Sequence, residues 1–147
     1  MATTNATVSI TSNDLTDDNL SINVSKQCYK AGTTIGLDQT TGLNRLYVTA
    51  TTQFDPFPAI KGATNAAENG KVYIANLSTT DTEYITVGIG DAVIGRLYAG
   101  DWLWMPWSPQ LQHVSDIEIT PSVATGINVE FMSIHNFANI YPNSADS

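Results

Sequence analysis

The chain has 147 residues, and its 14 Asp and Glu outnumber its 6 Lys and Arg, which gives a formal net charge of −8. This length suits one domain, so we expect residues 1–147 to form one, with frayed tails at about 1–4 and 142–147. The negative charge excludes nucleic acid as an expected partner, because the surrounding field repels phosphates. No stretch has the roughly 20 apolar residues that span a bilayer, and the N-terminus lacks a signal-peptide pattern, so we expect a cytoplasmic product without a membrane partner.

Alternation of apolar and polar residues recurs along the chain and predicts strands with one buried face. The alternating stretches are 7–11, 20–25, 116–120 and 127–131. Runs that are richer in apolar residues predict strands enclosed more completely, either in the middle of a sandwich or under a neighbouring subunit. These runs are 45–51, 71–77, 84–89, 93–98 and 101–107.

Turn residues separate these stretches at short intervals, as in Asn69-Gly70, Gly90-Asp91 and Gly100-Asp101. Eight to ten short strands with such turns predict an all-β, single-domain β-sandwich of the jelly-roll or Greek-key type. No window of helical length keeps a period of 3.6 residues, so we expect very little helix.

Few residues suit catalysis or metal binding. Cys28 is the only cysteine, and its place at the end of an alternating run favours a buried or strand-end thiol over a nucleophile. His113 and His135 are interpreted as surface histidines, because no Cys or His has the spacing of a zinc site. We therefore expect no metal and no cofactor.

Two groups of carboxylates have ordinary explanations as well. Asp116 and Glu118 share the polar face of a predicted strand, where nothing indicates the raised pKa of a catalytic acid. Asp14, Asp17 and Asp18 lie in a predicted turn, which lacks the glycine and the spaced ligands of a calcium loop. We expect no catalytic residues and no enzymatic activity.

All three tryptophans lie within residues 102–107. If Trp102 and Trp104 share one face of a strand, Leu103 and Met105 share the other, and both faces need cover. The single core of a domain this size covers one face, so the other is a candidate subunit contact. A central strand packed on both sides and a sugar-stacking platform stay open as alternatives. The candidate interface residues for a subunit or capsid contact are Trp102, Trp104, Trp107, Met105 and Tyr98.

Residues 70–134 resemble short virion proteins of tailed bacteriophages, especially marine ones. In those proteins a strand, an asparagine turn, a second strand, a glycine-aspartate turn and an aromatic strand ending in Pro-Trp close a small β-sandwich. The matching segments here are 71–77, 83–88, 94–102, 105–107, 116–119 and 129–131.

The resemblance implies a structural role on the phage particle. It implies a head decoration or cement protein, made in the host cytoplasm, on the outer surface of the head. The alternative is a head-fibre, tail or fibre component, such as a carbohydrate- or receptor-binding module. The implied partners are the major capsid protein and further copies of the chain, for which capsid symmetry favours a homotrimer.

Overall fold

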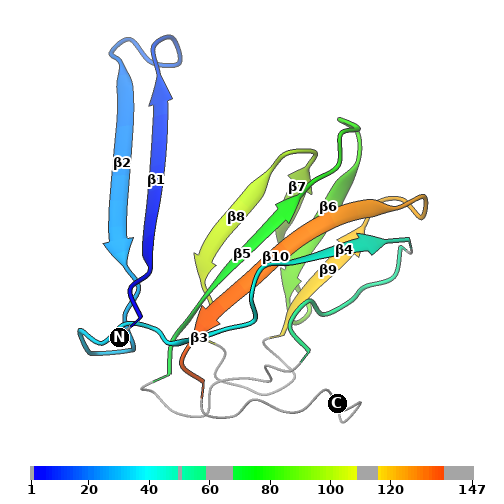
Figure 1. Ribbon diagram of the computed structural model, residues 1–147. Helices are drawn as coiled ribbons and strands as arrows, with labels where there is room; N and C mark the ends of the chain where they lie inside the picture. Colours follow the sequence, from blue (N-terminus) through cyan, green and yellow to red (C-terminus); the bar gives the residue numbers. More distant parts are fainter. Residues whose placement is uncertain (1, 50, 59–67, 109–115, 138–147) are drawn as a thin grey trace.

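In the computed structural model, residues 2–49, 51–58, 68–108 and 116–137 are described, and every regular element among them is a β-strand (Figure 1). The predicted all-β sandwich is confirmed. The expected C-terminal tail at 142–147 lies outside the described residues. The strands in chain order are β1 (Asn5–Ser12), β2 (Leu20–Gln27), β3 (Gln39–Thr40), β4 (Asn44–Val48), β5 (Gly70–Asn76), β6 (Tyr84–Ile89), β7 (Ala92–Tyr98), β8 (Trp102–Pro106), β9 (Ile117–Pro121) and β10 (Ile127–His135).

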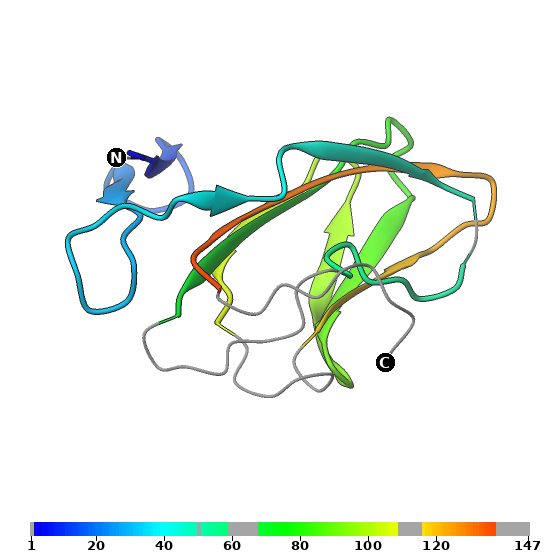
Figure 2. The same ribbon diagram turned by 60° about the horizontal axis from the view of Figure 1, so that its bottom comes forward.

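The described chain has two parts, which we call the arm and the body. The arm is the antiparallel hairpin of β1 and β2, and it stands to one side of the body in both ribbon views (Figures 1 and 2). The body contains two sheets. Sheet I has the order β3-β10-β5-β8, with β4 also paired to β10, and sheet II has the order β7-β6-β9.

The body has jelly-roll topology. Its antiparallel pairs are nested, so that β4 pairs with β10, Phe54 forms a single bridge with Ile119 of β9, β5 pairs with β8, and β6 pairs with β7. Such nesting describes one long hairpin whose two halves wind together around a core. The strand that would pair with β9 in a complete jelly roll is reduced here to the single bridge at Phe54.

The core of the body fills the space between the two sheets. Alternate residues of the facing strands point inward and are buried, because successive side chains of a strand point to opposite faces. These residues include Val72, Ile74, Val129 and Phe131 of sheet I and Ile85, Val87, Ile117 and Ile119 of sheet II. Trp107 joins this core, with its ring centroid 5.6 Å from that of Phe57 and 5.9 Å from that of Phe137.

A buried asparagine holds the connection between the sheets. Asn76 ends β5 and is fully buried. Its Nδ2 donates to the carbonyl oxygens of Glu83 (3.3 Å) and Leu97 (3.0 Å), and its Oδ1 accepts from the N–H of Ser78 (2.9 Å). These bonds fix the β5–β6 connection against β7 and leave the buried amide satisfied.

A tight turn places β8 at the edge of sheet I. Gly100, at φ 84°, supplies the left-handed conformation that other residues rarely adopt. The Asp101 N–H donates to the Tyr98 carbonyl, while Asp101 Oδ2 accepts from the Tyr98 N–H, each at 2.9 Å. The turn therefore starts β8 at Trp102, so that Trp102 and Trp104 point away from the core.

Two expectations about burial need correction. A buried face was expected for the alternating stretches 7–11 and 20–25, yet Ile10 and Val24 of the arm are 49% and 58% exposed. Alternation shows that one face is apolar but not that the same chain covers it. β5 and β6 are enclosed as predicted, whereas β4 and β7 are largely exposed at sheet edges, so this chain alone does not enclose the runs 45–51 and 93–98.

Candidate interaction site

The arm has one apolar face and one polar face. Its register places Val8 opposite Val24 and Ile10 opposite Ile22, and directly paired residues share a face. The opposite face consists of Thr, Ser, Asn and Gln side chains, such as Thr7 and Ser25, whose hydroxyls are 3.0 Å apart. A two-stranded hairpin is marginally stable alone in water, so an uncovered apolar face of this kind favours a partner.

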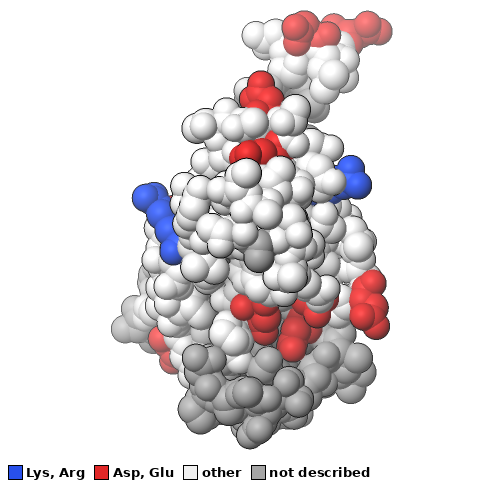
Figure 3. Space-filling view, turned by 90° about the vertical axis from the view of Figure 1, so that its right-hand side faces the viewer, with Lys and Arg blue, Asp and Glu red and all other residues white. Residues whose placement is uncertain are grey.

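The tip of the arm is acidic and carries an exposed leucine. Asp14, Asp17 and Asp18 lie in the turn between β1 and β2, and carboxylates cover the far end of the arm in Figure 3. Leu15, 74% exposed, donates its N–H to Ser12 Oγ at 3.1 Å. Among the described residues, no group of three or more His, Cys, Asp or Glu could hold a metal ion. The tip thus combines negative charge with one apolar side chain.

The outer face of sheet I carries an aromatic wall. Tyr73 of β5 lies directly opposite Trp104 of β8, and Trp102 lies opposite Ala75. Trp102 is 53% exposed, which is unusual for so large an apolar side chain. The wall therefore offers an aromatic surface on the face of the sheet that points away from the core.

A buried carboxylate lies beside this wall. Glu130 of β10, only 8% exposed, accepts from Arg45 Nε at 2.6 Å and from the Tyr73 hydroxyl at 3.1 Å. The Arg45 hydrogen bond holds the pKa of Glu130 below its usual value, whereas burial, followed by the Glu130 hydrogen bond, raises the pKa of Tyr73. Glu130 thus stays ionised and fixes the tyrosine ring in the wall.

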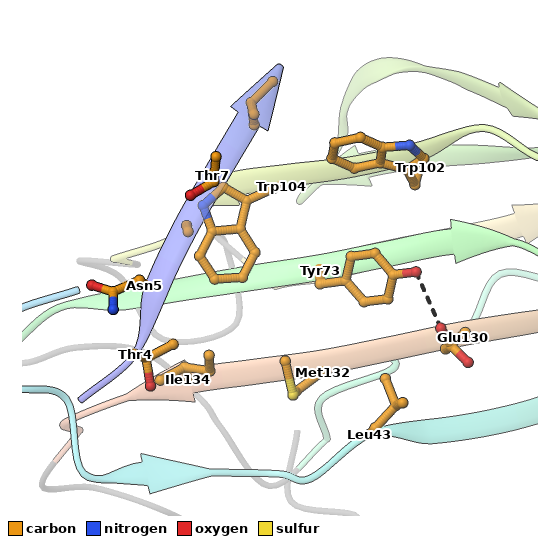
Figure 4. A pocket seen from close by; sticks show the side chains of 12 residues that line it. Thr4, Asn5, Thr7, Leu43, Tyr73, Trp102, Trp104, Glu130, Met132 and Ile134 are labelled. Carbon is orange, nitrogen blue, oxygen red and sulfur yellow. Dashed lines mark hydrogen bonds between the residues drawn. The ribbon is translucent and has the colours of Figure 1, made fainter. Parts of the chain in front are cut away.

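A groove of about 370 Å³ separates the arm from the aromatic wall (Figure 4). Residues 4–8 of the arm form one side of it, and the other side comes from β5, β8 and β10 together with Leu43. Where the two sides meet, Ala6, on the apolar face of the arm, packs together with Trp104 and Met132 against the buried cluster of Cys28, Leu37 and Ile134. The groove is lined by more apolar than polar surface, so it suits an apolar side chain or the face of a sugar ring.

The predicted interface residues fall into three places. Trp102 and Trp104 share the outer face of sheet I, as their alternation with Leu103 and Met105 predicted. Met105 packs on the inner side against the core, and Trp107 is buried within it, so neither lies on the aromatic wall. Tyr98 belongs to sheet II, where its ring centroid is 5.2 Å from that of Tyr84. Only Trp102 and Trp104 therefore come together.

The structure corrects one predicted surface residue and confirms one buried residue. His135 is the last residue of β10 and is 2% exposed, with Nδ1 2.9 Å from Ser133 Oγ and its ring stacked on Phe137, so the surface interpretation was wrong. Burial lowers its pKa below 6.5. Cys28 is buried just after β2, as predicted, and burial raises the pKa of its thiol. His113 lies outside the described residues.

Sequence reasoning missed the arm side of the groove and the buried carboxylate. The alternation at Val8 and Ile10 did predict a strand, but nothing in it showed that the hairpin would leave the sandwich. Glu130 is separated from Tyr73 by 57 residues and from Arg45 by 85. No local pattern connects side chains so far apart, so only the sheet register could bring them together.

Comparisons with protein-family models, with curated protein sequences and with solved structures gave no match to this chain. Within the described part of the chain, no helix is long and apolar enough to cross a membrane. The fold, the arm, the groove and the aromatic wall are therefore the structural features that bear on function.

Proposed function

We propose that this chain is a non-enzymatic structural protein that works by packing against copies of itself and against a larger assembly. The exposed apolar face of the arm is the observation that carries the proposal. Ile10, Ile22 and Val24 are between 43% and 58% exposed, although the body buries comparable side chains completely. Such a face is costly in an isolated molecule and is stabilising when a partner covers it.

More specifically, we propose a capsid decoration (cement) protein of a tailed phage, bound to the major capsid protein on the outer surface of the head. The resemblance of residues 70–134 to short virion proteins supports this role. The net charge of −8 also suits the outside of a shell, because charge repulsion disfavours a position next to packaged DNA. The homotrimer that capsid symmetry favours remains a prediction.

Protein identification in purified phage particles tests the proposed location. We expect the chain in intact particles and, after the heads are separated from the tails, in the head fraction. Antibody labelling of intact heads should then detect it on the outer surface. Detection only in infected-cell lysate would contradict a virion role, and detection only in the tail fraction would favour the tail or fibre alternative.

A carbohydrate-binding module at a fibre or tail tip is the second candidate, and the aromatic wall favours it. Exposed Trp102 beside Tyr73 offers flat rings on which a sugar can stack, and Glu130 is an acceptor within the same groove. Titration with polysaccharide from the host surface, followed by tryptophan fluorescence, tests this role. A saturable change that Trp102→Ala abolishes would support it, with Tyr98→Ala on the other sheet as the control.

A further inference from the structure

We propose that two copies of this chain associate through their arms, packed apolar face against apolar face in antiparallel orientation. The tip of each arm then occupies the groove of the other copy. This inference rests on the proposed function and deepens it, because it names the surface through which copies associate and puts a two-fold dimer in place of the homotrimer. It assigns one partner to two surfaces that the single chain leaves uncovered.

The register of the arm gives this contact its symmetry. Val8–Val24 and Ile10–Ile22 are successive pairs on the apolar face. Consider a two-fold axis that passes between these two pairs and runs perpendicular to the strands. It stacks the valine pair of each copy on the isoleucine pair of the other copy. Such an isologous contact is self-complementary, and face-to-face packing of apolar strands is how sandwiches normally form their cores.

Charge along the arm selects the antiparallel orientation. Asp14, Asp17 and Asp18 lie at the tip, whereas Lys26 lies at the base, opposite Ala6 and therefore on the apolar face. A parallel arrangement would place the two acidic tips together. The antiparallel arrangement instead places each acidic tip near the partner's Lys26, so opposite charges meet at both ends of the contact.

The same orientation brings an apolar side chain to each groove. The groove is bounded by residues 4–8, at the base of the arm, where the partner's tip lies in the antiparallel arrangement. The tip presents Leu15, the most exposed large apolar side chain among the described residues. Leu15 of one copy then fills the groove beside Trp102 and Trp104 of the other.

The groove contact is also needed for sufficient area. A strand pair of eight residues has a face of about 26 by 10 Å, and Ala6 at its base already packs against the body, so two arms alone bury less than about 500 Å² in total. Stable specific interfaces bury at least about 1,200 Å². Insertion of the two tips into the two grooves adds the contacts with Trp102 and Trp104 that the arms alone lack.

The sharpest test reverses the charge at either the base or the tip of the arm. The mass of the full-length protein in solution is then measured by sedimentation. Lys26→Glu makes both ends of the contact acidic, and Asp14→Lys with Asp17→Lys and Asp18→Lys makes both ends basic. We expect each variant alone to dimerise at least about tenfold more weakly than the unmodified chain. An equimolar mixture should restore the dimer, because both ends of a mixed pair then carry opposite charges.

Substitutions on the two faces of the arm test the packing independently. Ile10→Thr with Ile22→Thr keeps β-branched residues in both strands but removes the apolar contact, so the dimer should be lost. Ser9→Thr with Asn23→Thr, on the polar face, is the matched control and should leave the dimer intact. A dimer that survives the isoleucine substitutions, or a charge mixture that stays monomeric, would overturn the proposal.

Failure of the arm contact can be distinguished from failure of the proposed function. A monomeric chain that is nevertheless found on phage heads would refute the arm contact and leave the decoration role standing. If the dimer is lost in the variant with Ile10→Thr and Ile22→Thr but the chain is missing from phage particles, the arm contact is supported and the decoration role is refuted. A trimer that is insensitive to these substitutions would place self-association at another surface and overturn the arm contact.

Discussion

The arm and the body have the same strand pattern but different surroundings. Ile119 of the body and Ile10 of the arm each lie in an alternating stretch within an antiparallel pair, yet Ile119 is fully buried and Ile10 is 49% exposed. The body closes on itself because two sheets face each other. The arm has no second layer along most of its length. Alternation therefore specifies an apolar face, whereas cover is a property of the whole assembly.

The largest predicted difference between arm and body concerns the removal of a β-branched side chain. Ile74→Ala should lower the free energy of unfolding by about 3 kcal/mol, because it leaves a cavity in the core. Ile22→Ala in the arm, where the side chain is 43% exposed, should cost less than about 1 kcal/mol in dilute protein. Urea unfolding followed by tryptophan fluorescence measures both values. Equal losses would show that the arm belongs to the cooperative unit of the body.

The next largest effect should come from Asn76. Asn76→Ala removes the donor to the carbonyls of Glu83 and Leu97 and the acceptor for the Ser78 N–H, so it should lower the free energy of unfolding by about 2 kcal/mol. Asn23→Ala on the polar face of the arm is the control, and we expect almost no change there. A loss of similar size in both variants would contradict the role of Asn76 in joining the sheets.

The fold class could be predicted because alternation and turn residues are local signals. They located the strands now named β1, β2 and β4 to β10 and placed the acidic turn at 14–18. The jelly-roll winding was not specified, because it depends on distant pairs such as Phe54 with Ile119. β3, with two residues, was too short to give a pattern.

The candidate site was only half predictable for a related reason. Crowding of tryptophans in one strand indicated an exposed aromatic face, and Trp102 and Trp104 do form it. Trp107 follows the last residue of β8 and has the same parity as Leu103 and Met105, so alternation places it on the inner face, where it is buried. It was grouped with Trp102 and Trp104 because it is close to them in sequence, not because it shares their face. His135 was misjudged because the last strand is longer than its alternating stretch and ends in the interior.

A pH effect should distinguish the body from the arm. Burial lowers the pKa of His135 in the folded chain below the value of 6.5, and this effect outweighs the opposing field of Asp38. Well above pH 6.5 the ring is neutral in both states, so its contribution to stability is complete. As the pH falls below 6.5, the unfolded chain binds the proton more readily, and stability decreases.

Unfolding measurements between about pH 8 and pH 5 test this effect, because acidic groups with lowered pKa values still stay ionised in that range. His135→Gln keeps a hydrogen-bonding group near Ser133 and should flatten the pH dependence. Ser9→Ala on the polar face of the arm should leave it unchanged. A pH dependence that survives in His135→Gln would assign it to another group.

The smallest effect on stability should come from the turn of the arm. Ser12 Oγ accepts from the Leu15 N–H at 3.1 Å and donates to Asp14 Oδ1 at 3.0 Å, so this hydroxyl orders the tip. Ser12→Ala should change the free energy of unfolding of the body by less than about 0.5 kcal/mol, since these bonds are exposed. Amide hydrogen exchange should nevertheless become faster in residues 13–19, and the arm-to-arm dimer should weaken because Leu15 loses its fixed position. With Ser9→Ala as the control, faster exchange throughout the body would show that the arm and the body unfold together.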